Sequence, residues 1–361
     1  NYIHQRSTNM KIALITDSHF GARNDSLIFT DFFRKFYENI FFPTLKERGI
    51  KSVIHLGDVV DRRKFINYKT LNSMKDILFT PLKEMGAEIK VIVGNHDIYY
   101  KNTLSVNSMT ELTKGMDHVT VYAEPCEVPL TKDHTALFVP WICDDNRKEC
   151  MSMIEQTDAQ ILMGHLEVKG FEMFNGAFAD SGLDKKLFRR FEKVLSGHFH
   201  KKSDNGHIYY LGTQYEITWS DYRCPKGFHI LDTETRELTR VPNPMRIHKK
   251  LIYNDRDNDY VNMDLSQFKD TFVKVFVTNK TNEEMFNNLI DRLHNTVDTH
   301  EVNIIEDLNT DITASVKEDI LEQGEDTLTF LGNYVDQIDS DVDKHKLKNV
   351  IKDLYTEASE R

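Results

Sequence analysis

The stretch KVLSGHFH, residues 193–200, joins a short apolar run to a polar end. Val194 and Leu195 indicate a buried strand, and two histidines, His198 and His200, follow two positions apart. Side chains at positions i and i+2 of a strand point to the same face, so both imidazoles can reach one point if the strand pattern continues. A single Gly-His-x-His is weak support for a metal site. Its meaning depends on whether other segments end in the same way.

Four other segments repeat this pattern of an apolar run with a polar end. They are KIALITD (11–17), SVIHLGD (52–58), EIKVIVGNHD (88–97) and AQILMGH (159–165). Each run is rich in Val, Ile and Leu, which is typical of the buried strands of an α/β sheet. Helical stretches lie between them at 26–48, which Pro43 must kink or divide, and at 68–85, which ends at Gly86.

Two later runs predict further strands. HIYYLGT (207–213) and GFHILDTE (227–234) follow one another with turn-like residues between them, which favours a second sheet with antiparallel pairing. Together with the helices, the strands predict an α/β fold, namely a layered α/β/β/α sandwich. This domain should cover residues 10–245, because the two prolines in VPNPMRIHKK (241–250) mark a boundary.

The remainder of the chain divides into three parts. Residues 246–307 outline a small β-α-β unit, a capping domain of the α+β type, through FVKVFVT, NEEMFNNLIDRLHNT and EVNIIED. Residues 308–361 are acidic and helix-prone, and they end in an apolar stripe. The stripe can pack against the rest of this chain or against a helix of a partner protein, and it consists of Leu347, Val350, Ile351 and Leu354. Residues 1–9 resemble a vector-derived leader, which would place the native start at Met10.

Composition narrows the class of protein. No apolar stretch approaches the roughly 18 residues of a membrane helix, so we expect no membrane anchor. Four cysteines without CxxC spacing suggest neither a zinc ribbon nor a redox motif and fit a reducing cytoplasm. The net charge of −11 argues against a passive polyanion binder. A phosphate-rich substrate must therefore meet a local basic patch or bound cations.

Polar side chains follow each of the five apolar runs. They are Asp17, His19, Asp58, Asp61, Asn95, His96, Asp97, His165, His198 and His200. Because ligands gather outside the carboxyl ends of strands in open α/β sheets, we expect these residues to converge on one site. Imidazole and carboxylate ligands without thiolates suit Mn²⁺, Fe²⁺ or Zn²⁺, and there are too many for one ion. Two metals about 3.5–4 Å apart activate water and support in-line displacement at phosphorus, which predicts phosphoester hydrolysis.

The order of these motifs resembles that of the calcineurin-like metallophosphoesterases, whose pattern is DxH, GDxxD, GNH(D/E), GH and GHxH. By this resemblance, one metal is held by Asp17, His19, Asp58 and His200, and the second by Asp58, Asn95, His165 and His198. Asp58 would bridge the two. The resemblance also implies that His96 stabilises developing charge or protonates the leaving oxygen, and we expect Asp97 to orient His96. Asp61 is a second carboxylate behind the ligands or a simple loop acid, and it stays outside the predicted ligand set.

Beyond the core motifs, the chain resembles the SbcD-type nucleases of double-strand-break processing and, more closely, the recombination nuclease subunits of T4-like phages. The likeness rests on VGNHDIYYKN, GHLEVKGF, LSGHFH and YYLGTQYEITWSDYRCPKGFHILDTET. It implies a Mn²⁺-dependent DNA exonuclease, also an endonuclease, that acts on double-stranded DNA ends through two-metal-activated water in repair and recombination. Mg²⁺, Fe²⁺ and Zn²⁺ are alternatives to Mn²⁺. If a phage encodes the chain, its place of action is the host cytoplasm.

The same resemblance implies partners. These are an SbcC-type coiled-coil ATPase, gripped by tail helices, and a second copy of the chain, bound through helices for which 26–48 and 68–85 are candidates. Local cations could follow the DNA backbone: Arg62, Arg63, Lys201 and Lys202. One departure stands at Gln214, where relatives commonly have Pro, and it bears on the DNA groove.

Two other functions stay open. The motifs GDVVDRRK and GNHD match those of the protein phosphatases of the family only in part. Arg62 belongs to the matching part, so a phosphomonoesterase or Ser/Thr protein phosphatase stays an alternative. A scaffold that has lost catalysis is the third possibility, and the intact ligand set argues against it.

Overall fold

The computed structural model describes residues 10–132, 134–174 and 177–306, together with Val335, Lys344, Lys346, Leu347 and Val350. The predicted leader at 1–9 lies outside these residues. So does the predicted tail at 308–361, with its stripe, apart from those five positions. Within the described residues, no helix combines the length and the apolar character needed to cross a membrane.

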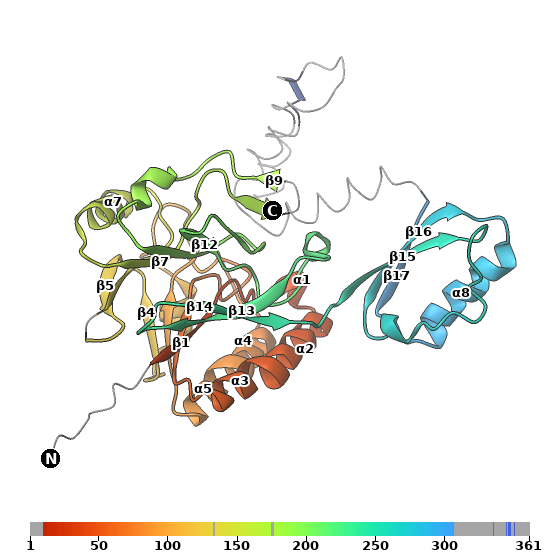
Figure 1. Ribbon diagram of the computed structural model, residues 1–361, viewed down its shortest axis with the longest axis horizontal. Coiled ribbons are helices and arrows are strands. Elements are labelled where there is room, and N and C mark those ends of the chain that lie inside the picture. The colour runs from red at the N-terminus through yellow and green to blue at the C-terminus, as the bar shows by residue number, and fades with distance from the viewer. Residues whose placement is uncertain are drawn as a thin grey trace.

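A large domain, residues 10–243, is built on two six-stranded sheets (Figure 1). The first has the order β14 (Leu238–Asn243), β13 (Lys226–Asp232), β1 (Lys11–Ile15), β2 (Ser52–His55), β3 (Glu88–Ile92) and β4 (Val119–Tyr122). The second has the order β11 (Ser203–Asp204), β12 (Ile208–Tyr210), β10 (Lys193–Gly197), β7 (Ile161–His165), β6 (Thr135–Val139) and β5 (Cys126–Pro129). Both sheets mix parallel and antiparallel pairs.

The sheets pack face to face with helices outside, as the α/β prediction required. Apolar side chains from both inner faces form one buried layer, for example Leu14 and Ile54 against Phe138 and Met163. The outer face of the first sheet is covered by α1 (Ala22–Asp25), α2 (Leu27–Phe36), α3 (Phe42–Glu47), α4 (Tyr68–Met74) and α5 (Thr80–Glu84) (Figure 1). The second sheet packs on α7 (Arg147–Gln156) and η3 (Lys185–Phe188). The shorter elements are α6 (Ser108–Leu112), η4 (Trp219–Asp221), β8 (Glu172–Phe174) and β9 (Ala177–Phe178).

The predicted pairing of the runs 207–213 and 227–234 is wrong. β12 pairs with β10 and β11 in the second sheet, whereas β13 pairs antiparallel with β1 and β14 in the first. The physical reason is the connection between them, which runs from 211 to 225 and is far longer than the 2–5 residues of a hairpin loop. This segment crosses from one sheet to the other.

The two long helical stretches both contain a proline and accommodate it in the same way. The predicted division at Pro43 is present, because a π-helical turn, η1 (Tyr37–Phe41), separates α2 from α3 just before it. The second stretch has the same arrangement, with η2 (Lys75–Phe79) before Pro81. Proline lacks the N–H of the regular helical ladder, and the wider turn absorbs the missing bond while the axis continues.

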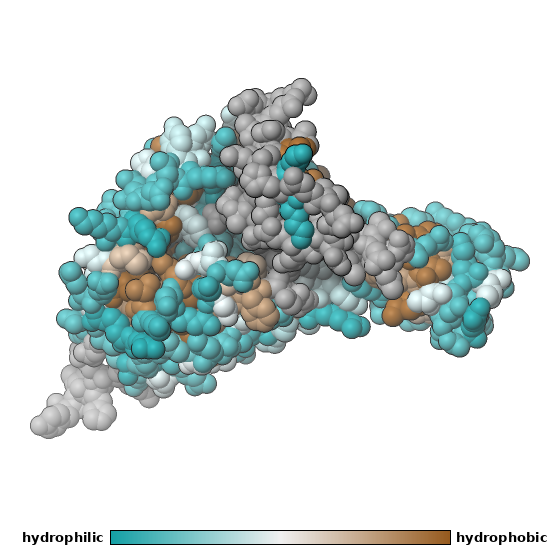
Figure 2. All heavy atoms as spheres, turned by 90° about the horizontal axis from the view of Figure 1, so that it is seen from above, coloured by the Kyte–Doolittle hydropathy of each residue, from teal (hydrophilic) through white to brown (hydrophobic). Residues whose placement is uncertain are grey.

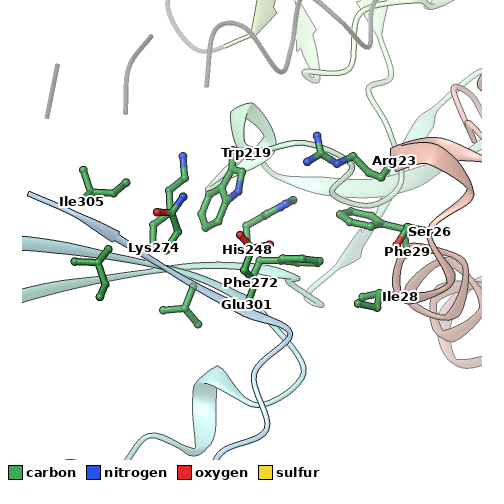
Figure 3. Close-up of a pocket in the computed structure, with 13 residues that line it drawn as sticks. Arg23, Ser26, Ile28, Phe29, Trp219, His248, Phe272, Lys274, Glu301 and Ile305 are labelled. Carbon is green, nitrogen blue, oxygen red and sulfur yellow. The ribbon is translucent and has the colours of Figure 1, made fainter. Parts of the chain in front are cut away.

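A small domain, residues 248–305, follows. It holds a parallel sheet of β15 (His248–Asn254), β16 (Phe272–Asn279) and β17 (Glu301–Ile305), with η5 (Ser266–Phe268) and α8 (Glu283–Asn295) packed on it. Figure 2 shows it as a lobe that projects from the large domain, with a mostly hydrophilic visible surface. A cleft of about 480 Å³ lies at the junction, between Arg23 and Phe29 of the large domain and Phe272 and Lys274 of the small one (Figure 3).

Candidate metal centre

The carboxyl ends of β1, β2 and β3 in one sheet meet those of β7 and β10 in the other. Short backbone bonds join the loops, with the Asp17 N–H donating to the Gly57 carbonyl over 2.9 Å and the His19 N–H to the Asp58 carbonyl over 3.1 Å. Asp17, His19, Asp58 and His198 all have positive φ, between 45° and 86°. Such conformations cost energy for residues with a Cβ and cluster at functional sites, so the loops are held in place by their surroundings.

Glycines allow the close approach of these loops. A Cβ on Gly94 would lie 2.2 Å from Asp58 Oδ1, and a Cβ on Gly197 would lie 2.1 Å from Thr16 Oγ1. Both distances are far inside van der Waals contact. The glycines before Asn95 and His198 are therefore required for packing around the carboxylates, which explains why the motifs contain them.

One group of potential ligands consists of Asp17, His19 and His200. The Nε2 atoms of the two histidines lie 3.0 Å apart, and each is 4.0 Å from Asp17 Oδ1. Asp58 Oδ2 is also 4.0 Å from His19 Nε2. All three side chains are buried or nearly so. Two imidazole nitrogens and a carboxylate oxygen thus face one small space.

A second group consists of Asp58, His165 and His198, with Asn95 between them. Asn95 Oδ1 lies 2.7 Å from His165 Nε2 and 3.1 Å from His198 Nδ1, and Asp58 Oδ2 lies 3.2 Å from His165 Nε2. The Leu56 carbonyl, 2.7 Å from His165 Nδ1, can only accept, so Nδ1 carries a proton. In the neutral ring, the lone pair of His165 Nε2 therefore points at two oxygen atoms.

The charged groups of the centre shift one another's pKa values. Burial alone would lower the pKa of His165, but the Asp58 carboxylate raises it to about 10. Burial alone would raise the pKa of Asp58, but His165 and His96 hold it well below its usual range. Burial and the nearby His165 lower the pKa of His198 to about 3. Among the protein groups alone, the buried negative charge of Asp58 is offset by a proton on His165. A bound cation would offset the same charge.

His96 and Asp97 follow Asn95 and differ in their contacts. His96 Nδ1 lies 2.6 Å from the Asp61 carbonyl, so this nitrogen carries a proton and Nε2 is the free one. The Asp97 carboxylate accepts backbone N–H groups from Asp58, Val59, Val60 and Gly94 over 2.8–3.3 Å. Our expectation that Asp97 orients His96 is therefore corrected. Asp97 positions the loop that carries Asp58, and Asp61 orients His96.

Three residues matter more than the sequence indicated. Asp61 Oδ1 lies 3.3 Å from His19 Nδ1, which places this carboxylate directly behind a potential ligand. The buried Lys226 ammonium donates to the His200 carbonyl over 3.1 Å and to Asp221 Oδ1 over 2.5 Å. Gln214 Nε2 donates to Ser18 Oγ over 2.9 Å, inside the Asp17–His19 loop. Asp61 belonged to a motif, whereas nothing in the sequence connected Lys226 to the site.

The cations predicted to follow DNA are largely compensated. Arg62 pairs with Asp25 Oδ2 at 2.8 Å, Lys201 with Glu172 Oε1 at 2.6 Å, and Lys202 with Asp204 Oδ2 at 2.7 Å. The guanidinium of Arg62 also lies over the Phe65 ring. Such surface pairs are weak and exchangeable, but they lower the local positive potential. The fourth predicted cation, Arg63, also has a partner in the structure.

The donor set fits divalent cations. Seven side chains present imidazole nitrogen, carboxylate oxygen and amide oxygen to two adjacent spaces, and no thiolate contributes within the described residues. Lone pairs that face one another at 2.7–3.2 Å, as at His165, are stabilised when a cation lies between them. Asp58 reaches both groups, being 3.2 Å from His165 and 4.0 Å from His19.

Comparisons with known proteins agree with this geometry. A family model described as calcineurin-like phosphoesterase matches residues 10–202. The chain is 30% identical over 318 residues to Exonuclease subunit 1 of Enterobacteria phage T4, an alignment that covers 87% of this chain and 90% of that protein. It is 24% identical over 272 residues to the SbcD subunit of the SbcCD nuclease of Staphylococcus epidermidis, covering 66% and 71%. The corresponding protein of Staphylococcus saprophyticus is 25% identical over 276 residues, covering 67% and 70%.

The matched segment contains all five strand-end motifs, and the structure brings their side chains to one place. The match also spans more than half of the chain. On both grounds, the chain belongs to the calcineurin-like phosphoesterases.

Proposed function

We propose that this protein is a DNA nuclease that hydrolyses phosphodiester bonds with two divalent cations, Mn²⁺ above all, as the nuclease subunit of an SbcCD-type complex. The single observation that supports it most is the paired ligand groups that share Asp58. The relatives named as an exonuclease subunit and as SbcCD nuclease subunits supply the substrate class. We propose Asp17, His19, Asp58 and His200 as the ligands of one ion, and Asp58, Asn95, His165 and His198 as those of the other.

The protein's own groups have separate tasks in such a reaction. When bound, the two cations would neutralise the phosphate and lower the pKa of water. The Asp61 carbonyl accepts the Nδ1 proton of His96, so Nε2 is the atom that meets the leaving oxygen. When the ring is doubly protonated, Nε2 gives its proton to that oxygen, and His96 is left as the neutral ring with its proton on Nδ1. Asp97 is a positioning residue, because it fixes the backbone at Asp58 through three amide groups. His96 is only 6% exposed, so bulk water has little access to its ring.

We also propose the partners that the relatives' names imply. An SbcC-type ATPase would bind the C-terminal tail, and the complex would act on double-stranded DNA ends in the cytoplasm of the cell, or of the host for a phage protein. A second copy would bind near the start of α4, where Phe65 and Tyr68 are 63% and 89% exposed. The stretch 26–48 is a weaker candidate for this contact, because its aromatic face is buried in the core.

The first experiment is Mn²⁺-dependent release of nucleotides from end-labelled linear duplex DNA, with a phosphopeptide in parallel. We expect release by the wild type and its loss in His96→Ser, since the ring that meets the leaving oxygen is gone. Turnover of the phosphopeptide with intact DNA would favour the alternative, a phosphomonoesterase or Ser/Thr protein phosphatase. Inertness toward both substrates would favour a scaffold.

A further inference from the structure

Beside the metal centre lies another cavity, of about 280 Å³, which shares the wall formed by His165. The loop after β6 contributes Trp141, the first turn of α7 contributes Arg147, the loop after β7 contributes Glu167, and the segment after β9 contributes Ser181. The volume is slightly below the roughly 300–1,000 Å³ of most small-molecule sites. A cavity of this size suits a single nucleoside and is too small for two.

Trp141 is a fixed aromatic wall of this cavity. Its ring centroid is 5.0 Å from that of His198 and 6.0 Å from that of His165, so it stands directly beside two of the proposed ligands. Its backbone N–H donates to the Val93 carbonyl over 2.9 Å, and its carbonyl accepts from Asn146 Nδ2 over 2.9 Å. The indole is half-buried. A base that enters beside the scissile phosphate therefore meets a rigid apolar plane.

The polar groups of the cavity lie around this plane. Ser181 Oγ donates to Glu167 Oε1 over 2.6 Å, so these two side chains satisfy each other in part. Arg147 is exposed, and across the ranges 10–132, 134–174 and 177–306 no acid pairs with its guanidinium. It is thus a cation near the centre that remains available for phosphate, unlike Arg62, Lys201 and Lys202.

We propose that this cavity binds the nucleoside next to the scissile phosphate, with its base stacked on Trp141 and the neighbouring backbone phosphate on Arg147. This inference rests on the proposed nuclease function and names how the site recognises its substrate. Every base offers a π-face, so stacking on one indole accepts all four bases, as a nuclease without sequence preference requires.

The chain has two tryptophans, Trp141 and Trp219, which allows a direct test. A Trp219→Phe protein reports only on Trp141, and a Trp141→Phe protein, the matched control, only on Trp219. Each is titrated with deoxyadenosine 5′-monophosphate in Mg²⁺, which does not itself quench indole. We expect saturable quenching in Trp219→Phe, none in Trp141→Phe, and none with inorganic phosphate. Absence of saturable quenching in Trp219→Phe would overturn the proposal.

Kinetics on DNA provide the second readout. Trp141→Ala should lose roughly 5- to 150-fold in kcat/KM, and Trp141→Phe should recover most of it, because phenylalanine retains a stacking face. Equal efficiency of the two variants contradicts stacking. In the His96→Ser background, Arg147→Gln should reduce the salt slope of DNA binding by about 1, whereas Lys148→Gln next to it should not. If the wild type leaves DNA intact, the proposed nuclease function is wrong. The fluorescence titration still tests whether the cavity binds a nucleoside.

Discussion

Asp61 shows how a single carboxylate can act on the centre without being one of the proposed ligands. Its side chain lies 3.3 Å from His19 Nδ1, and its carbonyl lies 2.6 Å from His96 Nδ1. Burial alone would lower the pKa of His19, but Asp61 and Asp58 raise it to about 9. One residue therefore orients both a proposed metal ligand and the proposed proton donor. Carboxylates in this position commonly fix the ring and raise the basicity of the ligand nitrogen.

We predict that Asp61→Asn weakens Mn²⁺ binding by about 10- to 100-fold, because the ring of His19 loses its anionic partner. Titration calorimetry with Mn²⁺ measures this without turnover. Asp204→Asn is a matched control, since Asp204 is a partly exposed acid that pairs with Lys202. Unchanged affinity in Asp61→Asn would mean that Asp61 is only a loop acid. The substitution changes only the side chain of residue 61, so the contact from its carbonyl to His96 Nδ1 is retained. A loss of affinity would therefore report on the side chain and not on the folding of the loop.

At the scale of single elements, the strands that end in motifs could be predicted and their assignment to sheets could not. The runs before Asp17 and Asp58 are apolar on both faces, and they form β1 and β2 at the centre of the first sheet. The partners of β12 and β13 depend on a 15-residue crossing, 211–225, whose path is set by tertiary contacts. Lys226 is part of β13, and its contact with the His200 loop follows from that path. No local pattern encodes such a contact.

β13 also carries a buried histidine, His229, with a consequence for stability. Burial, with Arg240 and Lys202 nearby, lowers its pKa to about 3. In the unfolded chain the pKa of His229 is near 6.5, so between about pH 6.5 and pH 3 the unfolded chain binds more protons than the folded one. The free energy of unfolding therefore falls as the pH drops through this window. The loss attributable to this one group is about 2 kcal/mol at pH 5.

We predict that His229→Gln removes this dependence. The free energy of unfolding, measured with urea at pH 7 and pH 5, should fall by about 2 kcal/mol less in the variant than in the wild type. Glutamine keeps a polar side chain without a titrating nitrogen, so the comparison isolates the charge. An equal fall in both proteins would show that His229 is solvated at low pH and that other groups control acid stability.

At the scale of the whole molecule, the two domains meet through few contacts. Glu216, buried in the large domain, accepts the N–H groups of Ile247 and His248 over 2.9 and 3.0 Å. Rings complete the junction, with Phe29 stacked on Phe272 at 5.4 Å and Trp219 near His248 at 4.7 Å (Figure 3). Two lysines of the small domain add cation–π contacts, Lys250 over the Tyr222 ring and Lys274 over the Trp219 ring. The position of the small domain therefore depends on one carboxylate, on ring contacts and on these two cations.

The same scale gives a physical account of the net charge of −11. Arg62, Lys201 and Lys202 are paired with acids, so we expect the chain to attract nucleic acid poorly through general electrostatics. In the proposed nuclease, binding of phosphate would then depend on the proposed divalent cations and on Arg147. Affinity for DNA should consequently be low until divalent cations and a partner subunit are present.

The buried carboxylate at the junction leads to a last prediction. Glu216→Ala removes an anionic acceptor from two backbone amides, and each such bond contributes about 1.5–3 kcal/mol. Local opening of the linker should become roughly ten-fold or more frequent, since 1.4 kcal/mol corresponds to a factor of ten. Trypsin cleavage at Arg246, Lys249 or Lys250 reports this opening, with Glu237→Ala as the control. Cleavage at the wild-type rate would show that the ring and cation–π contacts hold the domains together without Glu216. Faster cleavage with unchanged Mn²⁺ affinity would show that the junction opens independently of the metal centre.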